Sequence, residues 1–146
     1  MPIYSSHGIA FEDGKIVANM EHKEYGHLLL GGRFNPEEAA LLEKSVDTPN
    51  EVITAAEVLA RELEEELYTS TCRIDRYMGW TTDRIKTLDG QIHDVDRMYF
   101  FRISLGLPYE EPLSHASGEL RLMTVDEIQK EMVSPAMAKI VRMNFI

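Results

Sequence analysis

The segment from Thr48 to Leu67 constrains the fold more than any other stretch of the sequence. Thr48-Pro49-Asn50-Glu51 has the form of a capping box with proline inside it, and helix-forming residues run from there to Leu67 or Tyr68. At about 100° per residue, an apolar stripe forms on one side of this helix. The stripe consists of Ala56, Leu59, Ala60, Leu63 and Leu67. This is the longest helix expected in the chain, and its stripe must face a hydrophobic core.

The rest of the chain alternates between strand and helix signals. Strands are expected where apolar, aromatic and β-branched residues gather, at residues 8–11, 15–20, 27–30, 73–82, 97–105 and 119–123. Asp13-Gly14 predicts a hairpin turn, Gly31-Gly32 a sharp bend or a close approach of backbone to a ligand, and Asp89-Gly90 a further turn. Start signals predict three shorter helices, at about residues 36–44, 125–132 and 135–145. The buried stripe of the last one is expected to comprise Met137, Ile140, Val141 and Met143.

This order of elements predicts an α/β fold in which a mixed β-sheet is sandwiched between helices. A chain of 146 residues has the usual size of one domain, so a single domain over residues 1–146 is expected.

Four glutamates end the long helix, in the run Arg61-Glu62-Leu63-Glu64-Glu65-Glu66-Leu67. Glu62, Glu65 and Glu66 fall within an arc of about 100°, whereas Glu64 points nearly opposite. Like charges at this spacing repel one another by a few tenths of a kcal/mol per pair. An oxygen-seeking divalent cation between them converts that repulsion into binding. The alternative is that a Glu-rich run is merely a solvated helix face.

Composition narrows the class of protein. The formal charge of -10 disfavours binding to a nucleic-acid polymer or to an anionic membrane surface. The single cysteine, Cys72, excludes an internal disulfide and a zinc finger. No apolar span has membrane length and the start does not resemble a signal peptide, so a cytoplasmic location is expected. The five histidines show no metal-ligand spacing, and surface positions are expected for them.

The glutamate run resembles the core of the Nudix box, the signature of the Nudix hydrolases. That pattern is glycine, five residues, glutamate, seven residues and then Arg-Glu-Φ-x-Glu-Glu-x-Gly-Φ, where Φ is apolar. The residues that match its second half are Arg61, Glu62, Leu63, Glu65 and Glu66. Gly32 and Glu38, with five residues between them, reproduce its first half.

The sequence departs from the box in two places. Twenty-two residues separate Glu38 from Arg61 where the family has seven, so an ungapped count from Arg61 gives the family's glutamate position to Ile53. Tyr68 and Thr69 stand where the family has glycine and an apolar residue. The expected insertion comprises the short helix and an extension of the long one.

The resemblance implies a Nudix-like fold and metal-dependent hydrolysis of a diphosphate linkage in a nucleoside diphosphate derivative, such as a nucleotide, a nucleotide sugar or a dinucleotide. It implies that Glu62, Glu65 and Glu66 ligate Mg²⁺ or Mn²⁺, with the Gly31 carbonyl as a further ligand. Arg61 would pair with these carboxylates and hold their rotamers. The catalytic base varies within the family: Glu62 is one candidate, and among distal acids Glu119 leads, with Glu110 and Glu111 behind it.

Three cations are candidates to receive the phosphates of this small-molecule substrate: Arg84, Lys86 and Arg97. Trp80, Tyr99 and Phe101 could stack on a base, but aromatic residues in predicted strands more often belong to the core. Two other functions stay open, a catalytically weak or inactive Nudix-fold module that senses a nucleotide and an α/β interaction domain whose acidic helix merely resembles the box. A homodimer is compatible with the sequence.

Overall fold

The computed structural model describes residues 2–22, 26–67, 72–105 and 120–145, apart from the side chains of residues 19–22, 26, 27, 66 and 67. In chain order these residues form β1 (Tyr4–Ile9), β2 (Phe11–Glu12), β3 (Lys15–His22), β4 (Gly26–Arg33), α1 (Pro36–Ser45), α2 (Asn50–Leu67), β5 (Arg73–Lys86), β6 (Ile92–Ser104), β7 (Leu120–Thr124), α3 (Val125–Glu131) and α4 (Pro135–Asn144). None of the helices among the described residues is long and apolar enough to cross a membrane.

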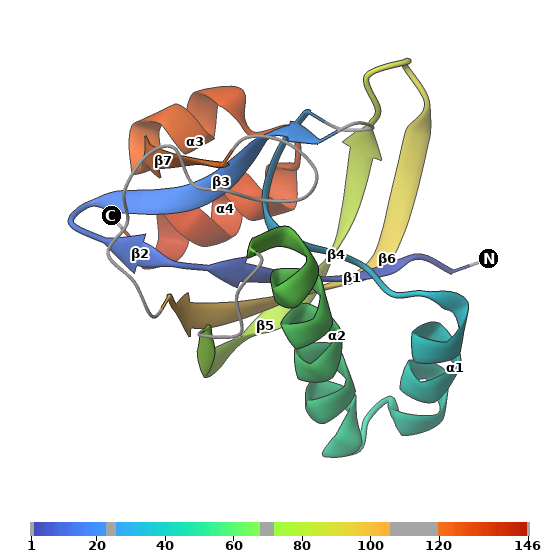
Figure 1. Cartoon of the computed structure of the whole chain (residues 1–146). Helices are drawn as coiled ribbons and strands as arrows, with labels where there is room; N and C mark the ends of the chain where they lie inside the picture. Colours follow the sequence, from blue (N-terminus) through green and yellow to red (C-terminus); the bar gives the residue numbers. More distant parts are fainter. Residues whose placement is uncertain (1, 23–25, 68–71, 106–119, 146) are drawn as a thin grey trace.

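The strands form one mixed sheet, as predicted. Its order is β2-β3-β4-β1-β6-β5, and β7 pairs with β3 outside this path. β1 runs antiparallel to β4 but parallel to β6, which makes the sheet mixed. α2 covers one face, and α3 and α4 lie on the other (Figure 1). Two apolar clusters fill the layers, one including Leu59 and Tyr99 towards α2 and one including Phe100 and Met137 towards α4. The predicted α/β/α sandwich is confirmed.

The N-terminal hairpin forms around the predicted turn. Asp13 and Gly14 both have positive φ, 53° and 78°, and β2 pairs with β3 through Phe11 and Ile16. The strands differ from the prediction in their limits, because residues 8 and 9 belong to β1, which pairs with β4 and β6 instead. β4 also runs on through Gly31-Gly32 and ends at Arg33 rather than stopping at the glycines. Pairing to β1 keeps both glycines in the strand although Gly31 has a positive φ, and the ladder outweighs the low strand propensity of glycine.

The long helix is rotated relative to the predicted stripe. Its described core-facing residues are Ala55, Val58, Leu59 and Leu63, all at most 2% exposed. Ala60, predicted to be buried, is exposed and Ala56 is half-buried. Relative to the predicted stripe, the buried face of α2 is thus rotated about the helix axis towards Glu62. This glutamate therefore lies inside the boundary of the core. Burial of a leucine such as Leu59 stabilises the fold by about 2 kcal/mol.

The predicted caps of α1, α3 and α4 form, but the capping box predicted at Thr48 does not. The Glu51 N–H donates to the Thr48 carbonyl oxygen rather than to its hydroxyl, and the Glu51 carboxylate accepts from the Asp47 backbone N–H. Asn35 and Thr124 each make a complete capping box, with Glu38 and Glu127 as the respective third residues. α4 begins at Pro135 after the Ser134 N-cap, as predicted. One part of its stripe is wrong: Met143 is 70% exposed, whereas Met137 and Val141 are fully buried.

Candidate metal-binding and catalytic site

Glu62 is enclosed between α2 and the glycine pair of β4. Its side chain is 17% exposed, against 59% for that of Glu65. A methyl group added at Gly32 would lie 2.5 Å from a carboxylate oxygen of Glu62. The absence of a side chain at Gly32 therefore provides the space that the Glu62 carboxylate occupies.

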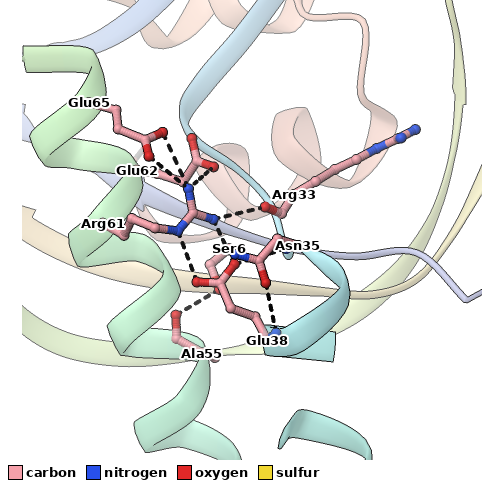
Figure 2. Close-up of polar contacts among 8 residues, drawn as sticks. All are labelled: Ser6, Arg33, Asn35, Glu38, Ala55, Arg61, Glu62 and Glu65. Carbon is pink, nitrogen blue, oxygen red and sulfur yellow. Dashed lines mark hydrogen bonds and ion pairs between the residues drawn. The ribbon is translucent and has the colours of Figure 1, made fainter. Parts of the chain in front are cut away.

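Gly31 sets the distance between β4 and β1. Its φ is +125°, a conformation that L side chains rarely adopt, and an added Cβ would collide with the carbonyl oxygen of Ser6. The Ser6 hydroxyl in turn donates a hydrogen bond of 2.8 Å to the Ala55 carbonyl oxygen of α2. β4, β1 and α2 are thus tied together at the level of the glutamates, as Figure 2 shows for Ser6 and Ala55.

Arg61 is the centre of the polar contacts (Figure 2). Its Nε and Nη2 donate to the two carboxylate oxygens of Glu38 at 2.9 and 2.7 Å, a bidentate pair. Its Nη1 donates to Glu62 at 3.0 Å and to Glu65 at 3.1 Å, and Nη2 also donates to the Arg33 carbonyl oxygen at 3.2 Å. The hydrogen bond with Glu38, the charge of Glu62 and the hydrogen bond with Glu65 raise the pKa of Arg61 further above its usual value. One guanidinium therefore holds two of the predicted ligands in place.

Glu38 is fixed by the start of α1. Its backbone N–H donates to the Asn35 side-chain oxygen at 2.8 Å, and its own carboxylate accepts from the Asn35 backbone N–H at 2.9 Å. Burial opposes ionisation of Glu38, but the hydrogen bonds from Arg61 and Asn35 outweigh it and hold its pKa below the ordinary value. The sequence Asn35-Pro36-Glu37-Glu38 thus serves both as a helix start and as an anchor for Arg61.

The insertion does not separate the two halves of the box. The residues between Glu38 and Arg61 form the rest of α1, a short connection and the first three turns of α2, and the chain then returns to Glu38. Ile53, which the ungapped count places at the family's glutamate position, is 54% exposed on α2. Spatial contact therefore assigns the glutamate of the first half to Glu38.

Burial of Glu62 changes the pKa of its carboxyl group, which matters for the binding of a cation. Burial, followed by the negative charges of Glu65 and Glu38, raises the pKa of Glu62, although Arg61 partly offsets this. A carboxylate in this position is stabilised by added positive charge. Within residues whose side chains are described, no three His, Cys, Asp or Glu residues converge as ready metal ligands. The third predicted carboxylate, that of Glu66, lies outside the described side chains.

The three predicted phosphate-binding cations do not gather around the glutamates. Arg97 donates to Glu51 at 2.9 Å and lies 3.9 Å from the centre of the Trp80 ring. Glu51 is eleven residues before Glu62, or about 16 Å along the helix. Arg84 pairs with Asp94 at 2.7 Å on the exposed part of the β5–β6 hairpin, on which Lys86 also lies. Their role in substrate binding stays a prediction.

The other candidates differ in how they are placed. Tyr99 and Phe101 are buried core residues, as favoured by their strand positions, whereas Trp80 is 43% exposed. The distal acids Glu110, Glu111 and Glu119 lie outside the described residues.

Two features of the site were not expected from the sequence. The Arg33 carbonyl oxygen accepts a hydrogen bond from Arg61 and helps to hold it. A pattern of side chains in the sequence does not predict a backbone contact of this kind. His7 was expected at the surface but is 3% exposed in β1, opposite Gly31 in the ladder. β1 lies inside the sheet between β4 and β6 and is buried at every position from Ser5 to Ile9, so no alternation along this strand marks His7 as internal.

Comparison with known proteins bears on the fold. Neither a protein-family model nor a curated protein matches the chain. Solved structures do match, among them a Nudix hydrolase from Nitrosomonas europaea with a TM-score of 0.61 and 12% identity, covering 97% of this chain and 87% of that one. The DNA mismatch repair protein MutT (family Nudix hydrolase) from methicillin-resistant Staphylococcus aureus 252 matches with a TM-score of 0.57 and 18% identity over 98% and 95% of the chains.

A third solved structure, the MutT protein from Methanosarcina mazei Go1, matches with a TM-score of 0.55 and 18% identity, covering 99% of this chain and 93% of that one. The similarity extends over nearly the whole length of both chains, at low sequence identity. The chain therefore has the fold of the Nudix hydrolases.

Proposed function

We propose that this protein is a metal-dependent hydrolase of the Nudix type that cleaves a diphosphate linkage in a nucleoside diphosphate derivative. The observation that carries the proposal is the contact of Arg61 with Glu38, Glu62 and Glu65 against Gly32. Residues from both halves of the split box meet at one place, on the fold that the box characterises. A merely solvated acidic helix face gives no reason for Glu62 to be enclosed or for Glu38 to return to Arg61.

The residues fit an oxygen-seeking divalent cation. Glu62 and Glu65 are carboxylates on either side of one guanidinium nitrogen, and Gly32 leaves the space beside Glu62 free of a side chain. Mg²⁺ and Mn²⁺ prefer oxygen donors of this kind. Glu62, Glu65 and Glu66 would hold the metal, with the Gly31 carbonyl as a further ligand. When bound, the metal would neutralise charge on the diphosphate and lower the pKa of a water molecule.

The residues of the chain would act by positioning. Arg61, fixed by Glu38, would keep the carboxylates of Glu62 and Glu65 in one orientation, which lowers the cost of assembling the site. Glu62, which is enclosed beside Gly32, is one candidate for the base. Glu119 stays the alternative base.

The decisive experiment compares three isosteric variants. Glu62→Gln, Glu66→Gln and Glu64→Gln each remove one charge from the same helix, and Glu64 is exposed on its solvent-facing side. Loss of a metal ligand should lower kcat by a factor of hundreds to thousands, or roughly 3 to 5 kcal/mol. Glu64→Gln should leave kcat within about twofold. The measurement is turnover of a panel of nucleoside diphosphate derivatives with saturating Mg²⁺ or Mn²⁺, with identification of the products.

Equal turnover in all three variants would contradict the catalytic assignment. A nucleotide-sensing module with little or no turnover is the second candidate, and the engagement of both carboxylates by Arg61 favours it, because a metal has to compete with this cation. That function predicts thermal stabilisation of the wild-type protein by a nucleotide without product formation. An interaction domain predicts neither effect.

A further inference from the structure

Two arginines face each other on the side of the sheet that carries α4. Arg76 of β5 and Arg102 of β6 are cross-strand partners, after a register shift that leaves Asp75 unpaired in the ladder. Side chains directly opposite each other on neighbouring strands lie on the same face, and two positive charges in this arrangement repel. Arg102 stacks over the rings of Phe11 and Phe145, at 5.8 and 5.1 Å from their centres, which places it on the α4 face.

Both arginines line one cavity. It has a volume of about 500 Å³ and lies between β2 and the paired ends of β5 and β6. Phe11 and Leu105 contribute apolar surface to its wall. The cavity lies on the opposite face of the sheet from the glutamates of α2. It also lies at another level along β1, because Arg102 is paired with Ile9 whereas Gly32, which contacts Glu62, is paired with Ser6.

The acids in the cavity wall offset the charge of the two arginines only in part. Asp75 uses one carboxylate oxygen for Arg73, at 2.6 Å, and the other for the Ser104 hydroxyl. These contacts, from Ser104 first and then Arg73, hold the pKa of Asp75 below its ordinary value, with a smaller contribution from the charge of Arg102. Asp75 therefore stays charged, and both of its oxygens are occupied by Arg73 and Ser104. Glu12 also lines the cavity. Across the part of the chain that the structure describes, no ion pair joins Glu12 or Asp75 to Arg76 or Arg102.

From this geometry we propose that the cavity binds a small phosphate monoester. A phosphate dianion neutralises both guanidinium groups at once, and each group offers parallel N–H donors that match phosphate oxygens. A carboxylate carries one charge and fills only one such fork. The volume exceeds that of phosphate alone, and the wall formed by Phe11 and Leu105 suits an apolar group on the ester. A local pair of cations in a protein of net charge -10 provides the attraction that the overall field does not.

The test measures phosphate binding to the full chain without metal, in the presence of a chelator, so that the glutamate site does not contribute. Inorganic phosphate and phenyl phosphate are titrated at constant ionic strength and followed by calorimetry or by NMR. We expect saturable binding, with phenyl phosphate the tighter of the two. Arg76→Gln should weaken it by roughly ten- to hundredfold, because a charged hydrogen-bonding group is lost. Arg142→Gln, a matched change on α4 outside the cavity lining, should alter it less than twofold.

Absence of saturable binding, or equal losses in the two variants, would overturn the proposal. Equal affinities for phosphate and phenyl phosphate would overturn the assignment of the apolar wall. If Arg76→Gln unfolds the chain, Arg76→Lys takes its place: it keeps the charge but not the fork, and should weaken binding severalfold. Glu62→Gln should bind both probes with unchanged affinity, which separates this result from that of the proposed hydrolase site.

Discussion

At the scale of single residues, the site depends on one guanidinium that joins three carboxylates. Arg61 contacts Glu38 with two nitrogens but shares a third between Glu62 and Glu65. Glu38 is therefore the fixed anchor, because the capping box already holds it in place. The two glutamates of α2 are held less firmly, which suits their proposed role of binding a divalent cation in competition with Arg61. This division of roles could not be read from spacing alone.

Glu38→Gln should destabilise the fold by about 1 to 2 kcal/mol, since a bidentate, partly buried contact to Arg61 becomes a neutral one. Glu37→Gln, an exposed change in the same helix turn, should cost less than about 0.5 kcal/mol. The measurement is urea unfolding of each variant. Adding Ile53→Glu should not rescue Glu38→Gln, because Ile53 faces solvent. Rescue would show that the ungapped alignment of the box is the right one.

The contribution of Glu38 should depend on pH. Its pKa is lowered in the folded state, so its contribution is fully present above the ordinary glutamate value, about 4.3. The contribution is lost as pH falls through the folded-state pKa. The difference in unfolding free energy between the wild type and Glu38→Gln should thus be constant from pH 6 to 8 and shrink below about pH 4. A difference that grows in acid would contradict the sign of this shift.

The two adjacent glycines should respond differently to alanine. At Gly32 the obstacle is the movable end of the Glu62 side chain, so Gly32→Ala should keep the fold within about 1 kcal/mol and displace the carboxylate. Metal affinity should then fall about tenfold or more. At Gly31 the obstacle is the Ser6 backbone and φ is positive, so Gly31→Ala should destabilise the fold by about 3 kcal/mol or more. Calorimetric metal titration and thermal melting distinguish the two.

At the scale of elements, local signals predicted the helices better than the strands. Asn35, Thr124 and Ser134 begin α1, α3 and α4 as predicted, because a cap depends on a few neighbouring residues. β6 begins at Ile92, five residues before its predicted start, because its polar first part is held by pairing to β5. Strand limits depend on partners that are distant in sequence.

The same distinction applies to the candidate site. The residues of the second half of the box were identified from sequence because they follow one another on one helix. The return of Glu38 to Arg61 was not, since the path of twenty-two intervening residues is set by tertiary packing of α1 on α2. The rotation of α2 that encloses Glu62 likewise follows from its fit to the sheet, through Ala55 and Val58, rather than from its apolar periodicity.

The packing of α1 on α2 should therefore influence the site. Leu42 is fully buried on α1, whereas its neighbour Leu41 is 57% exposed. Leu42→Ala should destabilise the fold by about 2 to 4 kcal/mol and also reduce turnover, because Glu38 lies on the same helix. Leu41→Ala should change either quantity little. The measurements are unfolding free energy and kcat at a temperature where both variants are folded. Full turnover in a destabilised Leu42→Ala would show that α1 does not position Arg61.

At the scale of the whole molecule, the negative net charge opposes binding of the negatively charged substrate proposed for this fold. Twenty-five acidic residues against fifteen lysines and arginines give a net charge of -10, which repels an anionic diphosphate. The glutamates that add to this repulsion lie on a fold shared with Nudix hydrolases, beside a glycine that leaves them space. Divalent cations should reduce this repulsion, through specific binding in addition to general screening.

Magnesium should consequently stabilise the protein more than sodium does at equal ionic strength. At a Mg²⁺ concentration one hundred times the dissociation constant, binding to the folded state alone contributes about 2.7 kcal/mol. For a chain of this length that raises Tm by about 5 to 10 °C.

Screening by sodium acts on all the acids and should raise Tm equally in the wild type and in Glu62→Gln. Only the additional magnesium effect should disappear in Glu62→Gln, while Glu64→Gln should retain it. Thermal melting of the three proteins in matched NaCl and MgCl₂ checks this. Equal magnesium shifts in all three would mean that the cation acts on the overall charge and not on the enclosed carboxylate of Glu62.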